Sequence, residues 1–176
     1  MKNVKKICLA AVMAAIYVVL DWLAVSVSAP FGGSMKLSVS GLPVIIIAAF
    51  FGPLWGAATG FVGAFLGQLI TYGFGATTLL WVLPAVARGL VFGCLFKAFK
   101  QSLKPQILCI ETIVSALSVT IINSVVMYID SKIYAYPAAI LGIALVNRII
   151  AAVITSIVFA LILPPILKAL KKIIKI

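Results

Sequence analysis

The sequence predicts an all-α membrane protein. Of its 176 residues, 65% are hydrophobic and 10% are charged, and the mean hydropathy is +1.30. A chain this apolar cannot present an ordinary surface to water. Its length and its unbroken series of apolar runs predict a single integral membrane domain over residues 1–176.

Six apolar segments, separated by glycine, proline or lysine, define the expected helices. We expect membrane spans at residues 7–27, 39–51, 54–70, 78–96, 106–128 and 138–163. A helix needs about 20 residues to cross a hydrocarbon core of ~30 Å, so the short second segment predicts a tilted or partly buried helix. If that helix does not cross, five spans remain. Loops are expected at residues 28–38, 71–77 and 129–137.

The positions of the basic residues, which give the chain a net charge of +11, indicate its orientation in the membrane. Lysines flank the apolar runs at the N-terminus, at residues 97–104 and in the C-terminal tail, whereas only Lys36 and Lys132 fall on the opposite side. The positive-inside rule therefore predicts six spans with both termini in the cytoplasm. The basic residues form no single clustered face, so we predict no nucleic-acid partner.

The side chains of most hydrolytic and metal-centred enzymes are missing. The chain has no histidine and three acidic residues, and its three cysteines are scattered among apolar residues. Acid–base catalysis and metal binding need groups of such side chains at defined spacings. We therefore expect no enzymatic activity, no metal site and no cofactor bound by this chain.

Arg88 and Glu111 are charged groups inside expected spans. They lie nine residues before Lys97 and seven residues after Lys104, which places both roughly 10–14 Å from the inner end of antiparallel neighbours. Burying either charge alone is costly, so the pattern favours a structural ion pair. The alternative is that Arg88 helps couple movement to a cytoplasmic partner.

Arg148 lies near mid-membrane in the sixth segment, next to Asn147. Asp21 lies in the outer half of the first segment, so an Asp21–Arg148 pair is one interpretation. The other is that Arg148 faces an outward-opening cavity and binds an anionic group of a ligand, for which a guanidinium is well suited.

Further polar and aromatic residues lie toward the outer ends of the segments. Aromatic residues there also form interfacial belts, whereas an amide in lipid requires a partner. An outer pocket with aromatics, amides and a cation fits a small planar or carboxylate-bearing solute. The candidate ligand-binding residues are Lys36, Gln68, Tyr72, Trp81, Asn123, Tyr128, Asn147 and Arg148.

Small residues recur at helical spacing in the first and third segments. Gly56, Gly60, Gly63 and Gly67 permit close helix packing, which we expect to occur inside the protein. In the first segment the small residues are Ala10, Ala11, Ala14 and Ala15, which together form a smooth face near the cytoplasmic end.

The chain as a whole resembles the substrate-binding (S) components of energy-coupling factor (ECF) vitamin transporters of prokaryotes. The resemblance depends on the length, the six helices with both ends inside and three motifs. These motifs are Ala10-x-x-x-Ala14, a short second helix bounded by Leu42-Pro43 and Gly52-Pro53, and Gly56-x-x-x-Gly60.

This resemblance implies a multi-pass subunit of the cell membrane that captures a vitamin or vitamin precursor from outside. It implies association with a transmembrane coupling protein and two ATPases, which would use the ATP. The alanine face (Ala10, Ala11, Ala14 and Ala15) would contact the coupling protein. The ligand would bind toward the outer face, beneath the loops that follow the first, third and fifth helices.

The substrate expected from the intramembrane arginines is anionic, such as pantothenate or a folate-like molecule. Folate-binding members tend to carry an acidic residue in the glycine-rich region, where this chain has Gly63-Ala64-Phe65-Leu66-Gly67. Two other functions remain open: a small-solute transporter that works alone, and a membrane scaffold subunit without a ligand.

Overall fold

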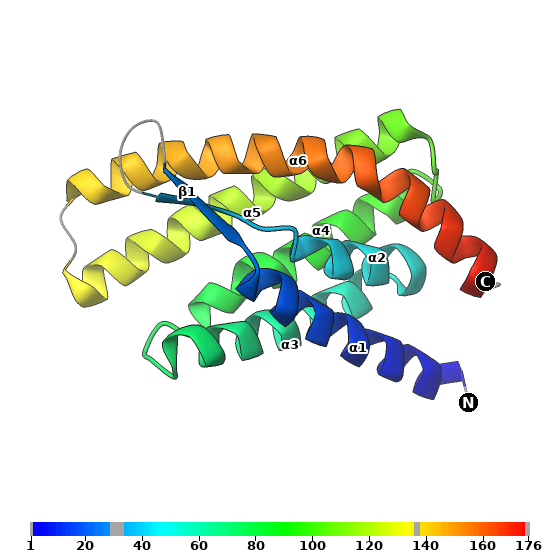
Figure 1. The fold of residues 1–176 in the computed structure, drawn as a ribbon, viewed down its shortest axis with the longest axis horizontal. Helices are drawn as coiled ribbons and strands as arrows, with labels where there is room; N and C mark the ends of the chain where they lie inside the picture. Colours follow the sequence, from blue (N-terminus) through cyan, green and yellow to red (C-terminus); the bar gives the residue numbers. More distant parts are fainter. Residues whose placement is uncertain (1, 29–33, 136–137, 175–176) are drawn as a thin grey trace.

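The computed structural model describes residues 2–28, 34–135 and 138–174, and over these residues it is a bundle of six α-helices with one β-hairpin (Figure 1). The elements are α1 (Lys2–Trp22), β1 (Val25–Ser28), β2 (Ser34–Leu37), α2 (Gly41–Phe51), α3 (Pro53–Tyr72), the 3-10 helix η1 (Leu80–Val82), α4 (Leu83–Ala98), α5 (Pro105–Tyr134) and α6 (Ala138–Ile174). In the described part of the chain, four segments are long and apolar enough to span a membrane: Pro53–Tyr72, Leu80–Ala98, Pro105–Tyr134 and Gly142–Lys172.

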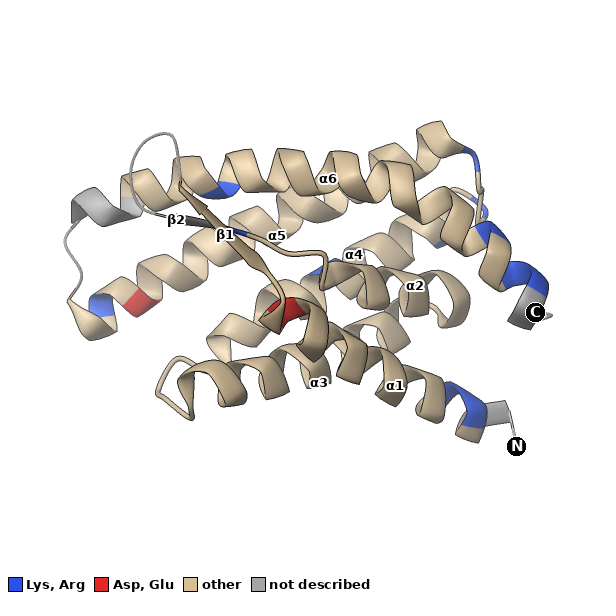
Figure 2. Cartoon of the chain, in the orientation of Figure 1, with Lys and Arg blue, Asp and Glu red and all other residues tan. Residues whose placement is uncertain are grey.

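Both ends of the chain lie at the same end of the bundle (Figure 1). Basic residues gather at that end, near the two termini and in the connection between α4 and α5 (Figure 2). The hairpin and the connection between α3 and α4 lie toward the opposite end. With the positive-inside rule, the lysine-rich end is cytoplasmic and the hairpin end faces outward.

Glycines bring the backbones of α3 and α4 into direct contact. A Cβ atom added to Gly56 would lie 3.2 Å from the Cα of Gly89, and one added to Gly60 would lie 2.5 Å from the carbonyl oxygen of Ala85. Gly63 faces α1 instead, where its Cβ would lie 2.8 Å from the ring of Tyr17. The glycine series therefore packs inside the protein, as expected from the small-residue spacing.

The short helix α2 is enclosed by its neighbours. Nine of its 11 residues are buried, and its side chains share a core with Phe92 and Phe96 of α4, Leu108 of α5 and Phe159 of α6. Its length of about 16 Å is half of what a membrane span needs. α2 therefore fills only the cytoplasmic half of the bundle, and Phe51 at its end lies under the ammonium of Lys6.

Two expected boundaries are wrong at the outer end of the molecule. Helix α1 ends at Trp22 rather than at residue 27, and the chain continues as the antiparallel hairpin, with Val25 paired to Leu37 and Ser28 to Ser34. The expected loop at 28–38 is therefore partly strand, and its residues 29–33 lie outside the described chain. Helix α5 likewise continues through the expected loop as far as Tyr134.

Helix α6 does not end at Pro164-Pro165. Both prolines lie inside the helix, which runs to Ile174 and changes direction in its last third (Figure 1). A proline pair removes backbone hydrogen bonds and usually bends or ends a helix. Here Leu163 and Leu167 are both buried in the core, so packing on each side of the prolines holds the helix together.

Candidate ligand-binding cavity

A cavity of about 740 Å³ occupies the outer half of the bundle, directly beyond the N-terminus of α2. Ser40 and Gly41 line its inner end, and the hairpin residue Lys36 lines it from the outer side. Its volume lies within the ~300–1,000 Å³ typical of small-molecule sites. The cavity exists because α2 is too short to fill the whole column enclosed by the longer helices.

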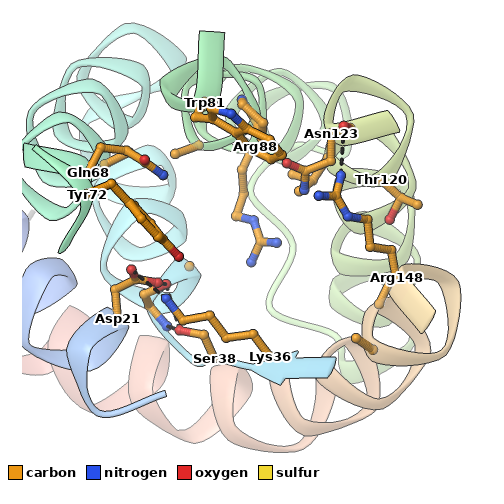
Figure 3. Close-up of a pocket in the computed structure, with 18 of the residues that line it drawn as sticks. Asp21, Lys36, Ser38, Gln68, Tyr72, Trp81, Arg88, Thr120, Asn123 and Arg148 are labelled. Carbon is orange, nitrogen blue, oxygen red and sulfur yellow. Dashed lines mark hydrogen bonds and ion pairs between the residues drawn. The ribbon is translucent and has the colours of Figure 1, made fainter. Parts of the chain in front are cut away.

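The hairpin is attached to α1 at the cavity wall. The Lys36 ammonium lies 3.0 Å from Asp21 Oδ2, and the Ser40 hydroxyl donates to Asp21 Oδ1 at 3.3 Å (Figure 3). The expected Asp21–Arg148 pair is therefore not formed, because Lys36 takes its place. This ion pair positions β2 beside the opening of the cavity.

Arg148 lies on the opposite wall, on α6. Its Nη1 donates to the backbone carbonyl of Asn123 at 2.7 Å, and its guanidinium carbon lies 5.2 Å from the centre of the Trp81 ring (Figure 3). A cation over an indole is favourable, more so where water is excluded. Arg148 thus joins η1, α5 and α6 around the cavity.

The expected ion pair between Arg88 and Glu111 is absent. Arg88 instead lines the cavity, where its guanidinium projects into the interior and packs 5.4 Å from the centre of the Phe159 ring (Figure 3). Glu111 is 0% exposed and lies outside the cavity lining, and neither of its carboxylate oxygens has a hydrogen-bond partner among the described residues. The residue spacing predicted the depths of Arg88 and Glu111 in the membrane, but it could not predict which face of its helix each residue occupies.

Seven of the eight candidate ligand-binding residues line the cavity. They are Lys36, Gln68, Tyr72, Trp81, Asn123, Asn147 and Arg148. The eighth, Tyr128, is not among the lining residues, is 57% exposed, and contacts the ammonium of Lys132 instead. Three of the seven, Gln68, Tyr72 and Trp81, stand together along one side in Figure 3.

Several residues that line the cavity were not predicted from the sequence. Tyr17 and Asp130 are the most informative, because both carry polar atoms on long apolar helices. Asp130 was assigned to a loop, but it is 5% exposed on α5, and its Oδ1 has no hydrogen-bond partner in the described part of the chain. An intramembrane polar residue is a candidate functional group by default, and that signal could have identified Asp130 once α5 was extended.

The alanine face of α1 is divided by the fold. Ala14 is 2% exposed and packs inside the bundle, so it offers no free surface. Ala11 and Ala15 are exposed, and Ala10 is partly exposed. The smooth outer surface near the cytoplasmic end therefore consists of Ala11 and Ala15 with part of Ala10.

Comparison with known proteins agrees with this architecture. A family model described as "ECF-type riboflavin transporter, S component" matches residues 1–172. The chain belongs to this family. A solved structure described as "Structure and mechanism of the S component of a bacterial ECF transporter" is 22% identical, with a TM-score of 0.66 over 97% of this chain and 99% of that chain. At this identity the match shows a shared fold. The comparison with curated proteins found no match to this chain.

Membership in this family assigns the coarse function. S components of ECF transporters are integral membrane proteins of prokaryotes that bind substrate and are not enzymes. This S component has the corresponding parts: a bundle with apolar spans and a cavity that opens toward the outer end.

Proposed function

We propose that this S component captures riboflavin at the outer face of the membrane. The observation that supports this most directly is the cavity of about 740 Å³, which combines aromatic walls with amides in a chain of the riboflavin S-component family. Riboflavin joins a planar isoalloxazine ring to a polyhydroxylated ribityl chain. Trp81 and Tyr72 provide aromatic surface for contact with the ligand, whereas Gln68, Asn123 and Asn147 provide hydrogen bonds.

The expectation of pantothenate or a folate-like anion is not supported by the family description, which names riboflavin. The structure also weakens the part of the physical argument that relied on Arg148. Arg148 donates a hydrogen bond to the Asn123 carbonyl and packs on Trp81, so its guanidinium already has partners without an anionic ligand. A neutral, acceptor-rich ring system needs no countercharge from Arg148.

A binding assay with competitors tests the substrate. Purified protein should quench riboflavin fluorescence with saturation at one flavin per chain, and an excess of pantothenate, folate or thiamine should leave the titration unchanged. Binding of one of these other vitamins without any riboflavin binding would contradict the assignment.

We propose further that this S component works with a transmembrane coupling protein and two ATPase subunits. Family membership supports such partners in general, and the exposed pair Ala11 and Ala15 on α1 offers a surface without bulky side chains. Small residues allow close approach of helix backbones within lipid. Copurification of the tagged chain with an ATPase pair tests this, and a stable partner-free protein that still drives ATP-dependent uptake would contradict it.

A further inference from the structure

Two charged groups without ion-pair partners among the described residues lie at different depths of the cavity, Arg88 at the inner end and Asp130 at the outer end, and they bear on how a flavin lies in it. We propose that riboflavin enters ring first, with the acceptor atoms of the isoalloxazine against Arg88 and the ribityl chain directed outward to Asp130. This orientation rests on the proposed function, because it takes riboflavin as the ligand.

Arg88 marks the inner end of the cavity. Its guanidinium lies against Gly41 at the start of α2 and over the Phe159 ring, and it makes no ion pair with any described residue. An arginine has only donors, and a buried cation without a partner is costly in a membrane protein. The C2 and C4 carbonyls and the ring nitrogens of an isoalloxazine supply the acceptors that this guanidinium lacks.

Asp130 marks the outer end. It lines the cavity, is 5% exposed, and its Oδ1 accepts no hydrogen bond from the described residues. A carboxylate is acceptor-only, so it requires donors. The hydroxyls of a ribityl chain are donors, whereas the isoalloxazine ring offers only its N3–H. Each end of the cavity therefore complements a different end of riboflavin.

Helices α5 and α6 form the wall between these ends. Along α5 the lining residues run from Ala116 to Asp130, a separation of about 21 Å at the helical rise. Along α6 they run from Thr155 on the inner side, through Ala152, Ala151, Arg148 and Asn147, to Ala144 on the outer side. Ala116, Ala151 and Ala152 leave space for a planar ring, and Asp130 and Asn147 provide polar groups farther out.

Two ligands and two variants test the orientation. Lumiflavin keeps the isoalloxazine ring but carries a methyl group in place of the ribityl chain. Because Arg88→Gln removes a hydrogen bond from a charged group, it should lower the affinity for riboflavin and for lumiflavin by the same factor, about tenfold or more. Asp130→Asn should lower the affinity for riboflavin by about fivefold and leave the affinity for lumiflavin roughly unchanged. Lys132→Gln, which alters an exposed charge outside the cavity lining, serves as the control.

Fluorescence titration gives the dissociation constants, and thermal unfolding of each variant shows whether it folds. If Arg88→Gln does not fold, Arg88→Lys replaces it, with a smaller but equal loss for both ligands. Four results would overturn the orientation. The affinities could change in the reverse pattern, or Asp130→Asn could weaken the binding of both ligands equally. Both variants could retain their affinity, or the wild-type protein could bind riboflavin but not lumiflavin. Absence of riboflavin binding by the wild-type protein would instead refute the proposed function, so the two failures are distinguishable.

Discussion

The variant Gly89→Ala tests the close packing of α3 and α4 that shapes the cavity. A Cβ at residue 89 would lie 2.5 Å from the backbone nitrogen of Ala57 and 2.6 Å from the carbonyl oxygen of Gly56. Real Cβ atoms essentially never approach other atoms closer than 3.0 Å, and here the obstacles are backbone atoms that cannot rotate away. The two helices must therefore move apart, and Arg88, the preceding residue on α4, must move with them.

The expected cost follows from two opposing effects. Overpacking of a close contact typically costs about 1–3 kcal/mol. Because the obstacles are backbone atoms, we take the upper end of this range, and alanine regains about 1 kcal/mol over glycine in a helix interior, so the expected net loss of unfolding free energy is about 2 kcal/mol. The matched control is Gly142→Ala on α6, because a Cβ at Gly142 meets nothing within 4 Å.

Unfolding in mixed micelles of mild detergent and dodecyl sulfate measures these free energies. Gly89→Ala should be less stable than wild type and bind riboflavin more weakly, whereas Gly142→Ala should match or exceed wild-type stability. Equal stability of Gly89→Ala and wild type, or equal losses in the two variants, would refute the packing argument.

Three further substitutions address other parts of the structure. Glu111→Leu should raise the unfolding free energy by about 1–3 kcal/mol in the same micelle assay, because it removes a buried carboxyl without hydrogen-bond partners; a loss of stability would contradict this. Ala11→Trp and Ala15→Trp should reduce ATP-dependent uptake in cells but leave riboflavin affinity unchanged, since both positions are exposed on α1; unimpaired uptake would exclude this surface. Lys36→Met should speed riboflavin release in stopped-flow fluorescence by less than about fivefold, because a partly exposed pair with Asp21 is worth about 0–1 kcal/mol; an unchanged release rate would show that the hairpin does not retain the ligand.

The bundle itself was predictable from hydropathy and charge. Apolar length gave the helices, the lysines gave the orientation, and glycine spacing gave the close contact that Gly56 and Gly89 now show. The hairpin was missed, because the alternation of valine and serine in β1 covers only four residues and directly follows the apolar run of α1. The continuation of α6 past Pro164 was also missed, because it depends on the burial of Leu163 and Leu167 against other helices.

The cavity was only partly predictable. The short second segment was evident, yet the space above it follows from how the other helices enclose α2, which no local pattern contains. Depth in the membrane could be calculated from helical rise for Arg88 and Glu111, but the rotation of each helix could not. As a result the sequence suggested an ion pair where the structure places Arg88 in the cavity and leaves Glu111 outside it.

The central claim, that the cavity beyond α2 holds a flavin, is tested most directly by filling that space. Ala151 lines the cavity, so Ala151→Trp should place an indole where the ligand would lie. Equilibrium dialysis against riboflavin should give one flavin per wild-type chain and none for a folded Ala151→Trp protein. Undiminished binding by that variant, or no binding by the folded wild-type protein, would contradict the account.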